Sequence, residues 1–555
     1  MSSRRSSSLV AAGIFLSRVA GLAREVAIAG FLGTSGAVEA FRAAMRIPNV
    51  LQNLLGEGVL SASFIPVYSR LLAQGREEEA GRVAGAIAGL LLVVTGGLVV
   101  LGVVLARPLV DVIAFGLTGE TRDLAVTLLR IVTPGVGLLV LSAWCLGVLN
   151  SHRRFFLSYV APVLWNVAQI AALVAAGTVL AGLLTAGTAP ERLADLAVVL
   201  AWGTVAGGAL QLGAQLPTVL RLTTGLRLSL SVRHPGVRQA LRAFGPIVLA
   251  RGGAQLSALV DLALASVLAG TAVAILGYAQ VLYLLPISLF GMSVAAAELP
   301  ELSARSDAAP GEGRERVRAG LARVAFFVAP IAGLFLVAGD LVVGALWQRG
   351  QFDAQDALTV GVVLGGYALG LLAITASRLL QSALYAAQAA AVVARASLLR
   401  VVLAAALGAA LMLQLDRVAL TPEGLALVGE LPAFTPLPAE AREALQGAGR
   451  LGPVGLTLGA AVGAWVEYLL LRRQVAARLG PVRLGGGELA RTLGATGVAM
   501  ALAVALRPLV EGLPPLLAGP AVAAAGAVAY LALGWWLGLT EARALLAAAR
   551  ARRGG

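Results

Sequence analysis

Fourteen apolar stretches, each long enough to cross a bilayer, follow one another through the 555-residue chain. A transmembrane helix needs about 20 mostly apolar residues. Only 13 % of this chain is charged, whereas soluble proteins carry about 25 %. We therefore predict an all-α polytopic membrane protein with helices at residues 9–33, 36–68, 83–106, 122–149, 157–183, 193–220, 239–268, 271–303, 317–346, 355–387, 389–415, 452–471, 488–510 and 516–539.

All 43 basic residues are arginines, and the formal net charge is +14. The arginines lie between the apolar stretches and do not gather on a polar domain, so we expect no nucleic acid as a partner. With the N-terminus placed in the cytoplasm, 27 arginines fall on that side and 8 in the opposite loops. By the positive-inside rule, this asymmetry predicts that both termini are cytoplasmic.

Several kinds of chemistry have no residues to support them in this sequence. Cys145 is the single cysteine, and His152 and His234 lie far apart, so we expect no disulfide, metal site or cofactor. A chain without lysine has no Walker motif, so ATP hydrolysis by this chain is not expected either. The 416–450 segment, the one long outer loop, is expected to form one or two short surface helices without a catalytic role.

Polar side chains recur every three or four residues along the second apolar stretch, which places them on one face of a helix. A charge at the bilayer centre costs about 2.5–3.5 kcal/mol, so this face is not expected to contact lipid. The residues of this face are Glu39, Arg42, Arg46, Asn49, Asn53 and Glu57.

The first and seventh stretches add further charges within the membrane, and arginines slightly outnumber acids in the combined set. This excess predicts a cationic, water-filled cavity whose guest is an anionic head group, because a guanidinium binds phosphate and carboxylate through paired N–H donors. The alternative is a purely structural role, with Arg42 paired to Glu39 or Asn49. The added residues are Arg18, Arg24 and Glu25 in the first stretch and Arg251, Gln255 and Asp261 in the seventh.

A weak internal repeat links residues 56–66 to residues 291–300, late in the second and eighth stretches. An offset of six helices predicts two parallel lobes with a substrate site between them. The expected division is an N-lobe at residues 1–222, a C-lobe at 223–450 completed by a helix at 451–480, and a C-terminal helix pair with a cytoplasmic tail at 481–555.

Several motifs of the first two stretches resemble the MurJ/MviN family of lipid II flippases. They are the run from Ser17 to Glu25, then Phe41, the run from Arg46 to Leu51, Glu57-Gly58 and the run from Ser61 to Val67. The segments Tyr278 to Pro286 and Phe290 onward look like the family's eighth helix. This resemblance implies fourteen helices, two six-helix lobes facing a cationic cavity, and a final helix pair that forms a groove for a lipid tail.

The resemblance also assigns expected site residues. Arg18 and Arg24 match arginines that the family needs for the substrate's pyrophosphate, Ala29 matches a small cavity position, and Glu57 matches the glutamate of helix two. Glu39 stands where well-known members have Asp.

Two expected cations of the family are missing from this sequence. Gln52 replaces a cavity arginine, and Gln280-Val281 replaces an Asp-Arg pair. We hypothesise that Arg251, Arg42 or Arg46 supplies the lost charge.

These observations predict a flippase, not an enzyme, that moves undecaprenyl-pyrophosphate-linked peptidoglycan precursor from the inner to the outer leaflet of a bacterial cytoplasmic membrane. We expect a monomer that contacts membrane lipids and the cell-wall synthesis machinery and is driven by membrane potential or an ion gradient. Export of another lipid-linked oligosaccharide or polysaccharide is the alternative. A membrane enzyme acting on polyprenyl phosphate through Glu298 and Glu301 is a weaker one.

Overall fold

The computed structural model describes residues 3–179, 189–291, 310–421, 424–444, 449–482 and 486–553. The chain divides into two compact units, each considered separately below. Unit 1 comprises Met1–Val267 with the short segment Arg349–Phe352, and unit 2 comprises Leu268–Gln348 with Asp353–Gly555.

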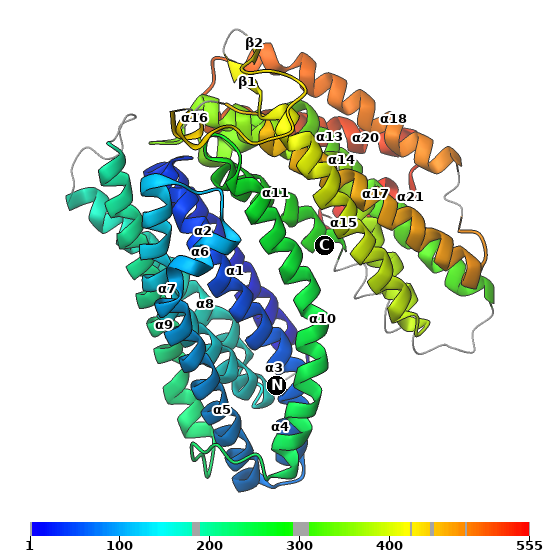
Figure 1. Cartoon of the computed structure of the whole chain (residues 1–555). Helices are drawn as coiled ribbons and strands as arrows, with labels where there is room; N and C mark the ends of the chain where they lie inside the picture. The colour runs from blue at the N-terminus through cyan, green and yellow to red at the C-terminus, as the bar shows by residue number, and fades with distance from the viewer. Residues whose placement is uncertain are drawn as a thin grey trace. The chain divides into compact units, whose positions relative to one another are not determined.

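Unit 1 is a bundle of long helices with short connections, coloured blue to green in Figure 1. Its helix α1 packs on α8, α8 on α9, α9 on α7, and α7 on both α2 and α5. Its elements are α1 (Ser3–Leu32), α2 (Gly36–Leu55), α3 (Glu57–Ser63), α4 (Ile65–Ala73), α5 (Glu77–Val104), α6 (Ala106–Ile113), α7 (Gly119–Ser151), α8 (Phe155–Val179), α9 (Pro190–Leu222) and α10 (Pro235–Ser266).

Unit 2 contains the remaining helices and a small hairpin (Figure 1). Helix α14 packs on α13 and α17, while α18 and α20 pack on α13 and on each other. Its elements are α11 (Ala272–Pro286), the π-helix η1 (Ile287–Gly291), α13 (Pro310–Trp347), α14 (Ala354–Ala386), α15 (Ala390–Leu415), β1 (Val418–Thr421), β2 (Gly424–Leu427), α16 (Ala439–Ala444), α17 (Gly452–Leu479), α18 (Gly486–Ala505), α19 (Arg507–Val510), α20 (Pro515–Trp536) and α21 (Thr540–Arg553).

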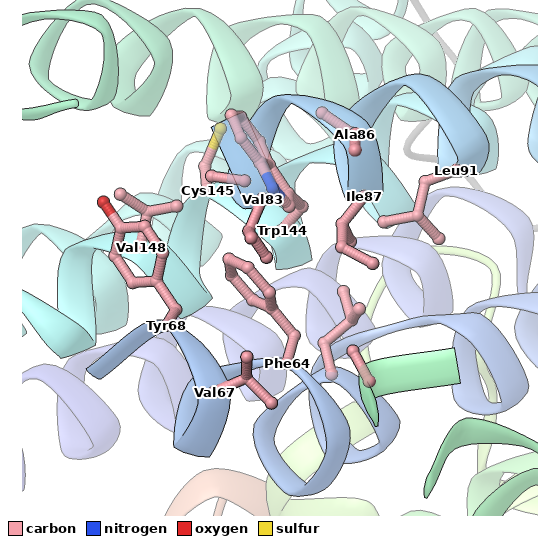
Figure 2. Packing of buried hydrophobic residues seen from close by; sticks show 14 of the residues in the cluster. Phe64, Val67, Tyr68, Val83, Ala86, Ile87, Leu91, Trp144, Cys145 and Val148 are labelled. Carbon is pink, nitrogen blue, oxygen red and sulfur yellow. The ribbon is translucent and has the colours of Figure 1, made fainter. Parts of the chain in front are cut away.

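The core of unit 1 lies where α3 and α4 meet α5 and α7. Figure 2 shows Phe64 and Tyr68 gathered with Val83, Ile87 and Trp144 in this cluster. The rings of Phe64 and Tyr68 lie 5.2 Å apart, and both side chains are fully buried. In a membrane protein such rings stabilise the bundle through close van der Waals packing between the helices.

Three glycines at intervals of four residues make a flat face on α5, and the extended segment 223–234 lies against it. A Cβ at Gly81 would stand 2.0 Å from the Thr224 carbonyl oxygen, and one at Gly85 would stand 2.1 Å from that of Arg227. The third glycine, Gly89, approaches the Ser229 carbonyl in the same way. Any larger residue would push the segment away, so these positions need glycine for close approach.

Hydropathy predicted the helical architecture correctly. Among its described residues the structure has 12 helices long and apolar enough to cross a membrane. Helices α1 and α10 are as long but are interrupted by charged residues, so the expected number of fourteen spans stays a prediction.

The second predicted stretch has a break that its hydropathy and residue spacing do not predict. The backbone leaves the helical conformation at Gly56, with φ −89° and ψ −151°, and α3 begins at the next residue. Pro48, a more obvious candidate for a break, lies inside the uninterrupted helix α2.

The 416–450 loop corrects an expectation. Instead of surface helices alone, it forms an antiparallel hairpin in which Val418 pairs with Leu427 and Thr421 with Gly424, followed by the short helix α16. The β-branched residues Val418 and Thr421 of β1 favour a strand, and Gly424 takes a positive φ of 123° at the turn.

Three expectations lie outside the described residues. Glu298 and Glu301 fall there, as does most of the second copy of the repeat. Arg251 lies within α10, but its side chain is also outside the part of the chain that the structure describes.

Candidate functional site

A three-residue ion network joins α1 to α2 within unit 1. Nη2 of Arg24 donates to Oε1 of Glu25 at 2.7 Å, and Nη2 of Arg42 donates to Oε2 of the same carboxylate at 3.0 Å. The Glu25 side chain is 9 % exposed, and both arginine side chains are 19 % exposed. Two guanidinium groups therefore share one carboxylate, and the network carries a net positive charge.

The Arg24 guanidinium also lies over the indole ring of Trp165, 4.8 Å from its centroid. Trp165 belongs to α8, which packs directly on α1. Cation–π contacts of this kind are worth about 0.5–2 kcal/mol and fix the plane of the guanidinium. Nε of Arg24 and Nε1 of Trp165 are buried and have no hydrogen-bond partner among the described residues.

Asn166, the next residue along α8, adds a buried polar group. Its side chain is buried, and its Nδ2 donates to the Pro162 carbonyl at 3.0 Å. Its Oδ1 accepts no hydrogen bond from the residues described and lies 3.9 Å from the position of a Cβ on Gly21. Gly21 of α1 thus lies beside this buried amide oxygen with no side chain of its own.

Two polar residues of α2 link it to α10. Nε and Nη2 of Arg46 both donate to the Ala258 carbonyl, at 2.9 and 2.6 Å. About two turns further along α2, Nδ2 of Asn53 donates to Oε1 of Gln255 at 3.2 Å. Arg46 thus binds main chain, whereas Arg42 binds a carboxylate, so the two arginines of this face have different local roles.

The other predicted residues of α2 are less closely grouped. Glu39 is buried at 4 % exposure, while Asn49 and Gln52 are half-buried. Glu57 is exposed and follows the break at Gly56, so the regular spacing that put it on the same face does not hold across that break.

The remaining predicted residues lie in several places. Arg18 is exposed on α1, seven residues before Glu25 and hence about 10 Å along the axis on the same side of the helix. Asp261 is exposed on α10, and Ala29 is completely buried near the end of α1. Gln280 belongs to unit 2, where its Nε2 donates to Oη of Tyr367 at 3.1 Å.

The contribution of α8 is not predicted by the sequence pattern. Trp165 lies in a continuous apolar run and reads as an ordinary core residue. The adjacent Asn166 was the available signal, because a buried amide inside a membrane helix needs a polar environment.

Chemically, the site can hold an anion by charge and by hydrogen bonds. The arginines of the network keep their charge at any physiological pH, and their forked N–H groups match the oxygens of phosphate. In the described structure Glu25 holds these donors.

The sequence model of the family described as "Lipid II flippase MurJ" matches residues 28–427. The chain is 35 % identical over 381 residues to a protein of Burkholderia cenocepacia named "Lipid II flippase MurJ", covering 67 % of this chain and 71 % of that protein. It is 32 % identical over 388 residues to a "Probable lipid II flippase MurJ" of Bdellovibrio bacteriovorus, covering 69 % and 71 %.

Two solved structures share the fold. One, described as "Lipid II flippase MurJ, inward closed conformation", has a TM-score of 0.71 at 18 % identity and covers 95 % of this chain and 98 % of that one. An inward-facing multidrug resistance MATE family transporter of the MOP superfamily has a TM-score of 0.60 at 15 % identity, covering 85 % and 96 %. At these identities the likeness concerns the architecture alone.

Proposed function

Because the chain belongs to the MurJ family of lipid II flippases, we propose that it carries lipid II across the bacterial cytoplasmic membrane. The chain is a multi-pass membrane protein of a transporter family. The observation that carries the proposal for the site is the sharing of Glu25 by Arg24 and Arg42.

In this proposal the pyrophosphate of the substrate takes the place of Glu25. A carboxylate offers one negative charge to the two guanidiniums, whereas a pyrophosphate offers more charge and more acceptor oxygens. Hydrogen bonds to charged groups contribute about 1.5–3 kcal/mol each. The exchange of partners therefore favours the substrate, and the Glu25 carboxylate keeps the arginines compensated when the substrate is absent.

Trp165 prepares Arg24 for this exchange. Its ring supports one face of the guanidinium at 4.8 Å, so the fork keeps its orientation when Glu25 is displaced. Arg18, two turns away on the same side of α1, adds a further positive charge to this side of the helix. Arg251 on α10 is proposed as a further cation of the site.

No covalent step belongs to this function. We propose alternating access, with the membrane potential or an ion gradient as the source of energy, because moving one elementary charge through 100 mV is worth about 2.3 kcal/mol. Both termini are proposed to be cytoplasmic, from the 27 to 8 distribution of arginines in the loops. The working form is proposed to be a monomer that delivers its cargo to the cell-wall synthesis machinery.

Complementation tests the proposal directly. A strain depleted of its own lipid II flippase is supplied with this chain, and lipid II accessible on the outer leaflet is measured. The wild type is expected to restore it, Arg24→Ala and Arg42→Ala to abolish the rescue, and Arg24→Lys to retain part of it.

Arg107→Ala is the matched control, because Arg107 is an exposed arginine paired with Asp123 at 2.9 Å outside the site. Rescue by Arg24→Ala at the level of Arg107→Ala would reject the proposed pyrophosphate contact. Failure of the wild type, at normal membrane abundance, would reject lipid II as the substrate.

The second candidate is export of another lipid-linked glycan. It is favoured by Gln52 and Gln280-Val281, where the resembled family carries charged residues. Gln52→Arg restores the arginine of the resembled family at this position. The variant should improve lipid II rescue if the loss of this charge weakens the binding of lipid II, and should leave rescue unchanged if the chain has another cargo.

A further inference from the structure

Two buried arginines lie together at the base of the 416–450 loop, within unit 2. Arg417 follows α15, and Arg450 precedes α17. Main-chain hydrogen bonds from Leu451 to Val418 at 3.0 Å and from Leu420 to Gly449 at 2.6 Å hold these two ends of the loop side by side. Arg417 is 8 % exposed and Arg450 only 1 %.

Each guanidinium uses one nitrogen on a main-chain carbonyl. Nη1 of Arg450 donates to the Asp416 carbonyl at 2.9 Å, and Nη2 of Arg417 donates to that of Thr435 at 3.0 Å. Nε and Nη2 of Arg450 and Nη1 of Arg417 are buried, and across the described residues they have no hydrogen-bond partner. Buried charged donors left in this condition are strongly destabilising.

One nearby acid, Asp416, attracts both arginines but supplies one negative charge against their two positive charges. Both carboxylate oxygens of Asp416 lie 3.2 Å from the Ala269 amide, and Oδ1 is beside Gly452 at the start of α17. Burial raises the pKa of Asp416, and burial together with the charge of Arg417 lowers the pKa of Arg450, against the pull of Asp416. The base of the loop thus has more positive than negative charge.

We propose that Arg417 and Arg450 bind a small inorganic anion of the size of chloride. An anion between the two guanidiniums would accept the unused N–H groups and supply the missing negative charge. It would also fasten the end of α15 to the beginning of α17. Its size is limited because both side chains are enclosed, which excludes a lipid head group.

The test uses the purified full chain in detergent, with thermal unfolding followed by tryptophan fluorescence. Sodium chloride is compared with sodium gluconate at equal ionic strength. Chloride is expected to raise the unfolding midpoint of the wild type by about 2 °C or more in a saturable manner, because an anion that binds only the folded state stabilises it. Arg450→Gln and Arg417→Gln are expected to lose this increment.

Arg221→Gln, a change at an exposed arginine of α9, should keep it. Equal midpoints in the two salts for the wild type, or an undiminished chloride increment in either Gln variant, would overturn the proposal. If one variant fails to fold, the other decides alone. In crystals grown with bromide, an anomalous peak between the two guanidiniums would support the site, and its absence at full data quality would reject it.

Discussion

The guanidinium of Arg42 on α2 donates a 3.0 Å hydrogen bond to the carboxylate of Glu25 on α1. Since Arg24 donates to the other oxygen of that carboxylate, replacing it by an amide removes the negative charge between the two guanidiniums and one of the two acceptor oxygens. We expect Glu25→Gln to lower the free energy of unfolding by about 1–3 kcal/mol. Thermal unfolding of the purified protein measures the loss, and Glu120→Gln, at an exposed acid of α7, is the control. An equal change in both variants would contradict the role of Glu25.

Arg46 places two nitrogens on the carbonyl of Ala258, so its replacement should loosen α2 from α10. Arg46→Met keeps an unbranched apolar stem and removes both donors; we expect a lower unfolding midpoint and a stability loss of about 1–3 kcal/mol. Arg46→Lys should lose less, since one ammonium still reaches the carbonyl. If both variants were as stable and as active as the wild type, the hydrogen bonds from Arg46 to Ala258 would have no importance for stability or transport.

The close approach of α5 to segment 223–234 predicts a steric effect. Gly85→Val places carbon where the Arg227 carbonyl lies, so the segment should detach and become susceptible to trypsin at Arg227 and Arg233. We expect a destabilisation of about 1–3 kcal/mol, the usual cost of overpacking. Gly96→Val on the same helix is the control, because no atom lies within 4 Å of its Cβ position. Trypsin patterns that agree between the two variants would refute this account.

His152 predicts a pH dependence of stability. Burial lowers the pKa of His152, because it removes water from the charged imidazolium and so disfavours that form. Nε2 of His152 lies 3.0 Å from Oη of Tyr68. Because the pKa is lower in the folded state, the contribution of the neutral His152 ring to the free energy of unfolding is fully present above the unfolded pKa, near 6.5. This contribution is lost as the pH falls below that value. His152→Gln should therefore reduce the change in unfolding midpoint between pH 7.5 and pH 5.5. A wild-type midpoint that rises on acidification would show the opposite sign.

Much of the fold follows from hydropathy, because in lipid every backbone polar group must be satisfied within a helix. The spacing of Arg42 and Arg46 likewise placed both on one face of α2. The partners of those arginines were a different matter: Glu25 and Ala258 lie on other helices, and a single sequence holds no information on which helices are neighbours. The same limit applies to Trp165, which was indistinguishable from core.

Local conformation was less predictable than helix placement. The break at Gly56 and the hairpin at β1 and β2 depend on backbone angles that single residues permit without requiring. Pro48 shows the converse, since its ring is accommodated within α2.

The shared carboxylate of Glu25 has a consequence for the half of the proposed cycle in which nothing is carried. A carrier must return to its starting conformation after it releases its cargo. If the two guanidiniums had no internal counter-charge, bound water and counter-ions would have to accompany them during that return. With Glu25 inside the network, the unloaded protein keeps a negative group in the position that we propose for the pyrophosphate of the substrate. The charge of the site is then more similar in the loaded and the unloaded protein. The direction of transport is therefore set by the cargo and the driving force, and not by the binding of other anions to the empty site.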